Sequence, residues 1–225
     1  MPDLEDARQF ATRLFPSSEP TPAGSVPLSE AAALDATGTV YIGCYPGLTV
    51  VCGIDVAVPR PSTLPETHIC PTGFAKTYYV ASKPEKEWGS FAMWDEGILT
   101  RSFSATPVHI HEDLGIPLLW EKPFWAGDFP LQHPAEVLPD PQSLPFHPQQ
   151  FSEGANREWL GFRYTDAPED PEVDPHSLTV FGFAIHHPGD GHESEPPTDV
   201  QHLTSQRSAP HNSRRIGLLR RYFGL

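Results

Sequence analysis

Two short runs of aromatic and β-branched residues, at residues 88–94 and 98–104, flank the tripeptide Asp95-Glu96-Gly97. Such runs favour extended strands, and a glycine can adopt the positive φ angle that a short hairpin loop requires. We therefore predict a β-hairpin over residues 88–104. The rest of the chain is interpreted around this hairpin.

Side chains alternate between the two faces of a strand, so the hairpin has two faces of different character. The more apolar face, which we expect to point into the core, carries Phe91, Met93, Leu99 and Phe103. The opposite face carries Trp88 and Trp94. We expect the later aromatic segment, residues 116–125, to cover the tryptophan face.

Further strands and helices are predicted on both sides of the hairpin. An apolar stripe at helical spacing predicts a helix over residues 3–15, with Asp3 as its cap. The other helices are expected at residues 61–70 and 149–162, and the other strands at residues 39–45, 48–54, 76–82 and 178–185. Successive strands on short turns predict an α+β fold with one antiparallel β-sheet of about six or seven strands. Two or three helices would cover this sheet, with the helices at 3–15 and 149–162 on one face, and residues 16–24 and 130–148 would be loops.

Composition divides the chain into three parts. Of the 225 residues, 38% are hydrophobic and 27 are proline, which predicts a compact domain with long Pro-rich loops and a disordered part. We place a single domain at residues 1–186. Residues 187–212, rich in acid, His and Pro, are predicted to be a disordered linker, and residues 213–225 a basic amphipathic tail.

The charge of the chain is distributed unevenly. The net charge is −14, which argues against nucleic acid as a partner of the main body. Residues 207–225 contain five arginines and no acidic residue, which leaves 10 basic and 29 acidic residues in residues 1–206. The sequence thus joins an acidic body to a cationic end.

The cysteines and the first residues point to a cytoplasmic protein. Cys44, Cys52 and Cys70 form an odd set without CxxC spacing, as expected for reduced thiols. The first ten residues are acidic where a signal peptide would be basic, and no apolar run has the length of a membrane span. We therefore expect a soluble cytoplasmic protein.

Short motifs along the chain resemble those of a known family. They are YIGCYPG at residues 41–47, VVC at 50–52, RPS at 60–62, FAMW at 91–94, RS at 101–102, EDLG at 112–115, FWAG at 124–127 and PFHP at 145–148. Together they resemble an uncharacterised family of actinobacterial proteins, a domain of unknown function, over residues 5–185. The resemblance implies one soluble domain without a catalytic signature. It also implies an extra strand before the first helix, whereas this sequence starts almost at the predicted helix. The His109-Ile-His111 pair and the tail differ from the family pattern as well.

A metal site is one interpretation of His109, His111 and Glu112. On a strand, residues two apart face the same side, and two imidazoles with a carboxylate can hold Zn²⁺ or Fe²⁺. The alternative is an exposed polar loop, because no third ligand is fixed by spacing. His147, His186 and His187 are possible partners only if the fold brings them close. No motif for a catalytic nucleophile or phosphate loop is present, so no catalytic residue and no cofactor are predicted.

The aromatic residues suggest a second candidate site. Five aromatic side chains could line a cleft for an apolar or ring-bearing ligand: Trp88, Trp94, Trp120, Phe124 and Trp125. The alternative is that these side chains are ordinary core and rim packing.

The tail is the third candidate. Its predicted partner-binding residues are Arg214, Arg215, Ile216, Leu218, Leu219, Arg220, Arg221, Tyr222 and Phe223. Such a segment can dock on another protein, lie on an anionic membrane or fold back on its own acidic body. IGLLRR at residues 216–221 is similar to the cargo-loading tails of proteins held inside encapsulin shells, although those tails usually have Ser at the position of Leu218.

We therefore expect a non-catalytic accessory protein that joins a larger assembly through its tail. One alternative is a small-ligand-binding protein or metal-dependent enzyme that uses the Trp-rich cleft near His109 and His111. The other is peripheral membrane attachment by the tail.

Overall fold

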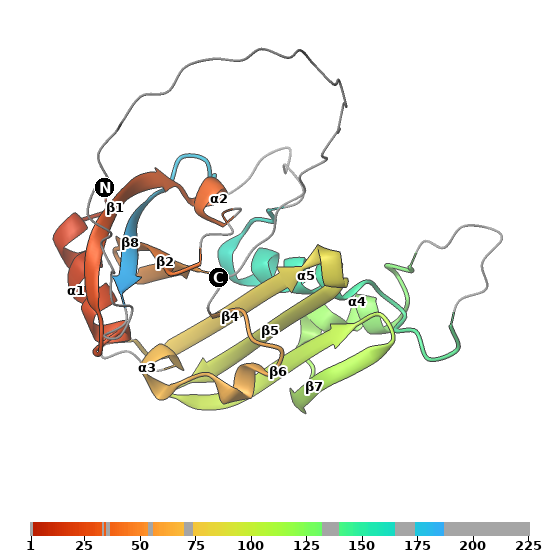
Figure 1. Cartoon of the computed structure of the whole chain (residues 1–225). Helices are drawn as coiled ribbons and strands as arrows, with labels where there is room; N and C mark the ends of the chain where they lie inside the picture. The colour runs from red at the N-terminus through yellow and green to blue at the C-terminus, as the bar shows by residue number, and fades with distance from the viewer. Residues whose placement is uncertain are drawn as a thin grey trace, which may run out of the picture.

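The computed structural model describes residues 2–32, 34, 37–53, 56–69, 74–131, 140–164 and 174–186. These residues form two four-stranded antiparallel sheets with short helices packed against them (Figure 1). The predicted α+β class with antiparallel strands is confirmed. The strands are divided between two sheets, however, where a single sheet was expected. The predicted linker and tail, residues 187–225, lie outside the described residues.

Sheet A joins the beginning of the chain to the end of its described part. Its strand order is β1-β8-β2-β3, with β1 at Glu19–Pro27, β8 at Thr179–His186, β2 at Thr39–Tyr45 and β3 at Leu48–Cys52. The last strand lies between β1 and β2 and pairs antiparallel with both. In Figure 1, β8 is the blue strand beside the red β1.

Strand β1 replaces part of the loop predicted over residues 16–24. It contains Pro20, Pro22 and Pro27, and it lies at the edge of sheet A. An edge strand tolerates proline because one side of its backbone needs no partner. The register also shifts between Pro22 and Ser25, as in a β-bulge. Over residues 19–24 the prolines therefore belong to an edge strand, and the loop predicted there is wrong.

Sheet B is a meander of four successive strands. Its order is β4-β5-β6-β7, with β4 at Lys76–Lys83, β5 at Trp88–Asp95, β6 at Ile98–Thr106 and β7 at His109–Gly115. Asp95 pairs with Ile98, and both loop residues, Glu96 and Gly97, have positive φ angles of 50° and 76°. Two positive φ angles are what a two-residue type I′ turn requires. The predicted hairpin is confirmed.

A β-bulge changes which residues share a face of the hairpin. Met93 pairs with Arg101, but the next residue, Trp94, pairs with Leu99. One extra residue in β6 reverses the alternation beyond it, so Leu99 packs with Trp94 and not with Phe91. The prediction that Leu99 shares the face of Phe91 and Phe103 is therefore wrong.

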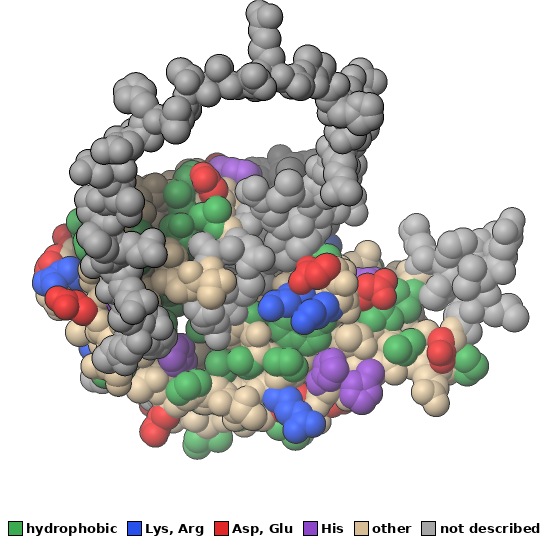
Figure 2. Space-filling view, viewed as in Figure 1, with side chains coloured by type: hydrophobic (Ala, Val, Ile, Leu, Met, Phe, Trp, Pro, Cys, Tyr) green, Lys and Arg blue, Asp and Glu red, His purple; other side chains and the backbone are tan. Residues whose placement is uncertain are grey.

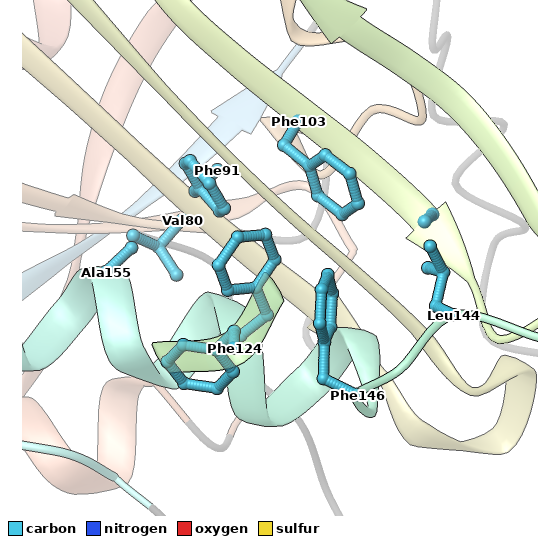
Figure 3. Packing of buried hydrophobic residues seen from close by; sticks show 9 residues of the cluster. Val80, Phe91, Phe103, Phe124, Leu144, Phe146 and Ala155 are labelled. Atoms are coloured by element: carbon cyan, nitrogen blue, oxygen red, sulfur yellow. The ribbon is translucent and has the colours of Figure 1, made fainter. Parts of the chain in front are cut away.

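The aromatic segment that follows β7 covers the face opposite to the one predicted. It forms a 3-10 turn, η4, at Leu119–Glu121 and a short helix, α4, at Lys122–Trp125. Its side chains pack against Phe91 and Phe103 together with helix α5, Pro148–Leu160. Figure 3 shows these two phenylalanine rings pointing from the strands toward Phe124 and Phe146. The tryptophan face is covered instead by residues 56–69, which include the turn η2 at Pro61–Thr63 and helix α3 at Glu66–Ile69.

Each sheet has its own long helix. Helix α1, Leu4–Leu14, begins where the Asp3 carboxylate accepts hydrogen bonds from the backbone N–H groups of Glu5 and Asp6. Its apolar stripe packs on Val40, Ile42 and Phe183 of sheet A, whereas α5 packs on sheet B. The two helices therefore do not share one sheet face as predicted, because the strands form two sheets. The remaining short elements are α2 at Leu28–Ala31 and η3 at Pro84–Lys86.

The close approach of two aromatic rings to helix α5 explains why Gly154 lies within this helix. A Cβ atom on Gly154 would lie 3.0 Å from the ring of Phe124 and 3.2 Å from that of Trp120. The glycine that weakens the helix as an isolated segment thus allows the aromatic segment to pack closely against it. Leu144 and Phe146, inside the predicted surface loop, are buried in the same core.

Candidate functional site

A cavity lies where the edge of one sheet faces the edge of the other. Strand β3 is an edge of sheet A, strand β4 is an edge of sheet B, and residues of both line a cavity of about 560 Å³. Helices α1 and α5 and the segment from Val56 to His68 contribute the remaining walls. This volume lies within the range of roughly 300–1,000 Å³ that is typical of small-molecule sites.

The walls of the cavity are rich in aromatic rings. The aromatic side chains in these walls are Phe10, Phe74, Tyr78, Tyr79, Trp94 and Trp159. The rings of Tyr78 and Trp159 lie 4.8 Å apart at 30°, and Phe74 meets Phe10 edge to face at 5.9 Å. The hydroxyl of Tyr79 donates to the carbonyl oxygen of Val58 and accepts from its N–H group, so it is already committed to the backbone. The rings therefore offer mainly apolar surface.

Asn156 is the polar exception in this wall. It lies on helix α5, lines the cavity and is only 1% exposed. Among the described residues, neither its Nδ2 nor its Oδ1 atom has a hydrogen-bond partner. Buried polar groups without partners are rare in native proteins, and each requires an explanation. Both atoms expose almost no surface, so the amide lies behind the cavity wall and is not open to the cavity.

Ionisable groups in the cavity wall carry little unpaired charge at neutral pH. Burial lowers the pKa of His68, which favours its neutral form. Lys76 is half exposed, and its Nζ atom lies 3.8 Å from the Asp95 carboxylate. A ligand inside the cavity would therefore meet a neutral imidazole at His68 and an ammonium group at Lys76 that lies beside a carboxylate.

The histidines make the stability of the protein depend on pH. Burial lowers the pKa of both His68 and His147, and the backbone N–H of Gln149 donates to Nδ1 of His147 at the start of α5. In the unfolded chain both imidazoles would bind protons near pH 6.5. The unfolded state therefore takes up protons first as the pH falls. The free energy of unfolding should decrease from about pH 6.5 downward through the folded-state pKa values.

Urea denaturation at about pH 7.5 and about pH 5.5 measures this difference. The wild type should be less stable at the lower pH, and His68→Phe should reduce the difference because it removes one titrating group. Equal stability of the wild type at both values would contradict the assignment of neutral buried histidines.

The five aromatic residues predicted to line one cleft are divided between the two faces of sheet B. Trp88 and Trp94 pack under residues 56–69, whereas Trp120, Phe124 and Trp125 belong to the core between the sheet and α5. A single cleft lined by all five does not form, because the strands of sheet B separate the two groups. Of the five, Trp94 alone lines the cavity described above.

The proposed metal ligands are not assembled into a site either. The rings of His109 and His111 lie 4.8 Å apart on edge strand β7, but the Glu112 carboxylate is buried and engaged elsewhere. It accepts hydrogen bonds from the hydroxyls of Ser62 and Ser102 and from the backbone N–H of Ser62. No group of three or more His, Cys, Asp or Glu side chains within the described ranges is placed to hold a metal ion.

The possible additional ligands are occupied elsewhere. His147 caps α5, and His186 contacts the hydroxyl of Thr21. His187 lies outside the described residues. The interpretation of His109, His111 and Glu112 as a metal centre is therefore not supported by this geometry.

A buried ion pair that sequence reasoning missed holds the aromatic segment on sheet B. Arg101 is fully buried and donates two hydrogen bonds to the equally buried Glu121, at 2.9 and 2.8 Å. It also donates to the Asp113 carboxylate and to the carbonyl oxygens of Ser102 and Leu114. Burial lowers the pKa of the Arg101 guanidinium, but the bonds to the two carboxylates outweigh this and raise it. This cluster lies away from the cavity and fixes the fold.

Asn156 was also missed, although the sequence carries a signal for it. It directly follows Ala155 and precedes Trp159 by three positions, so it lies beside the apolar stripe of the helix. A polar residue at such a position indicates a buried hydrogen bond or a ligand contact. The residues Arg214, Arg215, Ile216, Leu218, Leu219, Arg220, Arg221, Tyr222 and Phe223 of the predicted tail, like Cys70, lie outside the described residues.

The described residues thus define an α+β protein with two antiparallel sheets and an apolar cavity between their edges. Residues 1–183 match a family of unknown function, DUF6928, and the chain belongs to this family. The predicted membership of an uncharacterised domain family is confirmed. No curated protein and no solved structure matches the chain significantly. None of the helices in the described ranges has the length and apolar character needed to cross a membrane.

Proposed function

We propose that this protein binds a small, largely apolar molecule in the cavity between its two sheets and does not transform it chemically. The observation that supports the proposal most strongly is the cavity itself, of about 560 Å³, with aromatic side chains such as Tyr78, Trp94 and Trp159 in its walls. In a cavity of this size, a few polar groups among apolar side chains are typical of ligand recognition.

The state of the described cysteines favours binding over nucleophilic catalysis. Burial raises the pKa of the Cys44 thiol, and it raises the pKa of the Cys52 thiol to about 12. Both thiols therefore remain protonated at neutral pH, and the thiolate is the reactive species. Free thiols also agree with the cytoplasmic location that we propose for this protein.

Binding of the fluorescent apolar probe N-phenyl-1-naphthylamine tests this function. The full-length protein should bind about one probe per chain with increased fluorescence, as a single apolar site requires. Val51→Trp introduces an indole into the cavity wall and should abolish most of this binding. The matched change Val108→Trp lies on an exposed position outside the cavity and should leave it intact. Absence of probe binding by the wild type, or equal binding by both variants, would contradict the proposal.

Association with a protein assembly is a second candidate function. Edge strand β7 and the residues around it carry a series of exposed apolar side chains, namely Val108, Ile110, Leu114, Ile116 and Leu119. An apolar edge of this kind is typical of a contact surface. Acidic and basic side chains lie scattered over the face shown in Figure 2, without a single-sign patch. The five arginines of residues 207–225 remain a candidate recognition element of the same function.

Deletion of residues 207–225 tests the tail directly. If the tail recruits a protein partner, the deletion should abolish co-purification of that partner and leave probe binding in the cavity unchanged. Flotation with anionic liposomes measures the membrane alternative on the same two proteins. Retained complex formation after the deletion would exclude the tail as the anchor.

A further inference from the structure

We propose that the cavity binds a short, apolar peptide in extended conformation, which pairs through its backbone with the outer edges of β3 and β4. The inference rests on the proposed function, in which the cavity takes a separate molecule, and it names the class of that molecule. It follows from three properties of the cavity: the strand edges that bound it, the apolar layers that enclose it and its volume.

Strand edges bound the cavity on two sides. Every residue from 48 to 51 of β3 and from 76 to 80 of β4 lines it. Successive side chains of a strand point to opposite faces, so a cavity that meets all of them lies along the edge of the strand and not over one face. β3 ends sheet A and β4 ends sheet B, and no backbone–backbone hydrogen bond reaches their outer sides from any described residue. Such edges offer rows of N–H and C=O groups to an added strand.

Both faces of each edge are covered by apolar layers. On β4, Tyr78 packs on helix α5, whereas Tyr79 packs on the opposite face with residues 56–69. On β3, Val51 packs with helix α1, whereas Val50 packs with helix α2 on the other face. A strand that is covered on both faces carries a nearly continuous apolar run. The side chains of the peptide should therefore be apolar on both of its faces.

The volume of the cavity sets the length of the peptide. A strand residue rises about 3.3 Å, lies about 4.8 Å from the next strand and fills a layer about 10 Å deep, which gives roughly 160 Å³ per residue. The cavity of about 560 Å³ therefore corresponds to about three or four residues of one added strand.

Two matched peptides test this pairing by isothermal titration calorimetry with the full-length protein. Acetyl-Val-Leu-Val-amide keeps all its backbone N–H groups, whereas the same peptide with an N-methyl group on its central leucine loses the donor that faces one of the two edges. The parent peptide should bind at least about 10-fold more tightly, because the methylated peptide leaves an acceptor of that edge unpaired. A cavity that recognises only apolar surface predicts the opposite order, since the methyl group adds such surface. Equal affinities, or tighter binding of the methylated peptide, would overturn the inference.

Amide hydrogen exchange locates the pairing on the protein. The parent peptide should slow the exchange of backbone N–H groups within residues 48–51 and 76–80, because these groups gain acceptors. Strands β1 and β7 are matched controls, since they are the other two edges of the sheets and do not line the cavity. Exchange that slows at β1 or β7 and stays unchanged at β3 and β4 would overturn the assignment to this cavity.

The outcomes separate this inference from the proposed function. Binding of N-phenyl-1-naphthylamine without binding of the parent peptide would retain the ligand-binding function and reject peptide recognition. Failure of both the probe and the peptide to bind would reject the proposed function itself. Peptide binding that appears only after deletion of residues 207–225 would assign the two edges to the chain's own end and overturn the inference of a separate ligand.

Discussion

Replacing Arg101 with leucine should lower the free energy of unfolding by about 3–5 kcal/mol, the largest loss that we expect from any single substitution. Both Arg101 and Glu121 are fully buried, and removal of the guanidinium leaves the carboxylate of Glu121 in the core without its main partner. The carbonyl oxygen of Leu114 loses a donor as well. Urea denaturation at neutral pH measures the loss.

Two comparisons show whether the burial of an unpaired charge is the cause. The double variant Arg101→Met/Glu121→Leu removes both charges and should recover much of the loss, because an apolar pair of similar volume replaces the ion pair. Arg8→Ala breaks the exposed pair with Glu5 and should change the stability by less than about 1 kcal/mol. A loss in the double variant as large as in Arg101→Leu would show that packing, and not charge, dominates.

Replacing Gly89 with alanine should be the second most damaging change. A Cβ atom there would lie 2.2 Å from the carbonyl oxygen of Pro148 and 2.4 Å from its carbonyl carbon. Backbone atoms cannot rotate away as a side chain can, so strand β5 or the start of α5 must move. We expect a loss of at least about 1–3 kcal/mol, the usual cost of overpacking, measured by thermal or urea unfolding.

The same substitution should also weaken probe binding, because α5 carries Asn156 and Trp159 of the cavity wall. Gly53→Ala is the matched control. Among the described residues, its Cβ atom would find no neighbour closer than the Thr39 carbonyl oxygen at 3.6 Å, so the stability should change little. A Gly89→Ala variant as stable as the Gly53→Ala variant would contradict the close approach of α5 to the sheet.

Local signals predicted the individual elements well. The Asp95-Glu96-Gly97 loop, the cap at Asp3 and the apolar stripe of α1 depend on neighbours a few residues away, and all three are found as predicted. The division into two sheets depends instead on β8 inserting between β1 and β2. This pairing joins residues more than 130 positions apart, and no local pattern specifies it.

In sheet B, one extra residue in a strand made the prediction from strict alternation wrong. Strict alternation placed Leu99 with Phe103, but the bulge next to Trp94 moved it to the other side. Independently of the bulge, the aromatic segment was assigned to the wrong face, so the predicted cleft combined residues that the sheet separates.

The candidate site was the part least accessible from the sequence. Its walls come from α1, β3, β4 and α5, which meet only because the two sheet edges face each other. Polar residues within apolar stripes, such as Asn156 and Arg101, are signals of buried polar groups that the sequence reasoning did not use. Residue type alone does not show that Arg101 has buried partners while Asn156 has none in the described protein.

The most direct test of the central claim is the nuclear magnetic resonance signal of the Trp159 indole N–H during titration with N-phenyl-1-naphthylamine. A ligand held in the cavity should shift that resonance in a saturable manner and give intermolecular Overhauser contacts to Trp159, which lines the cavity. A Trp159 signal that remains unchanged while the probe binds elsewhere, or no binding at all, would contradict the proposal that this cavity is the functional site.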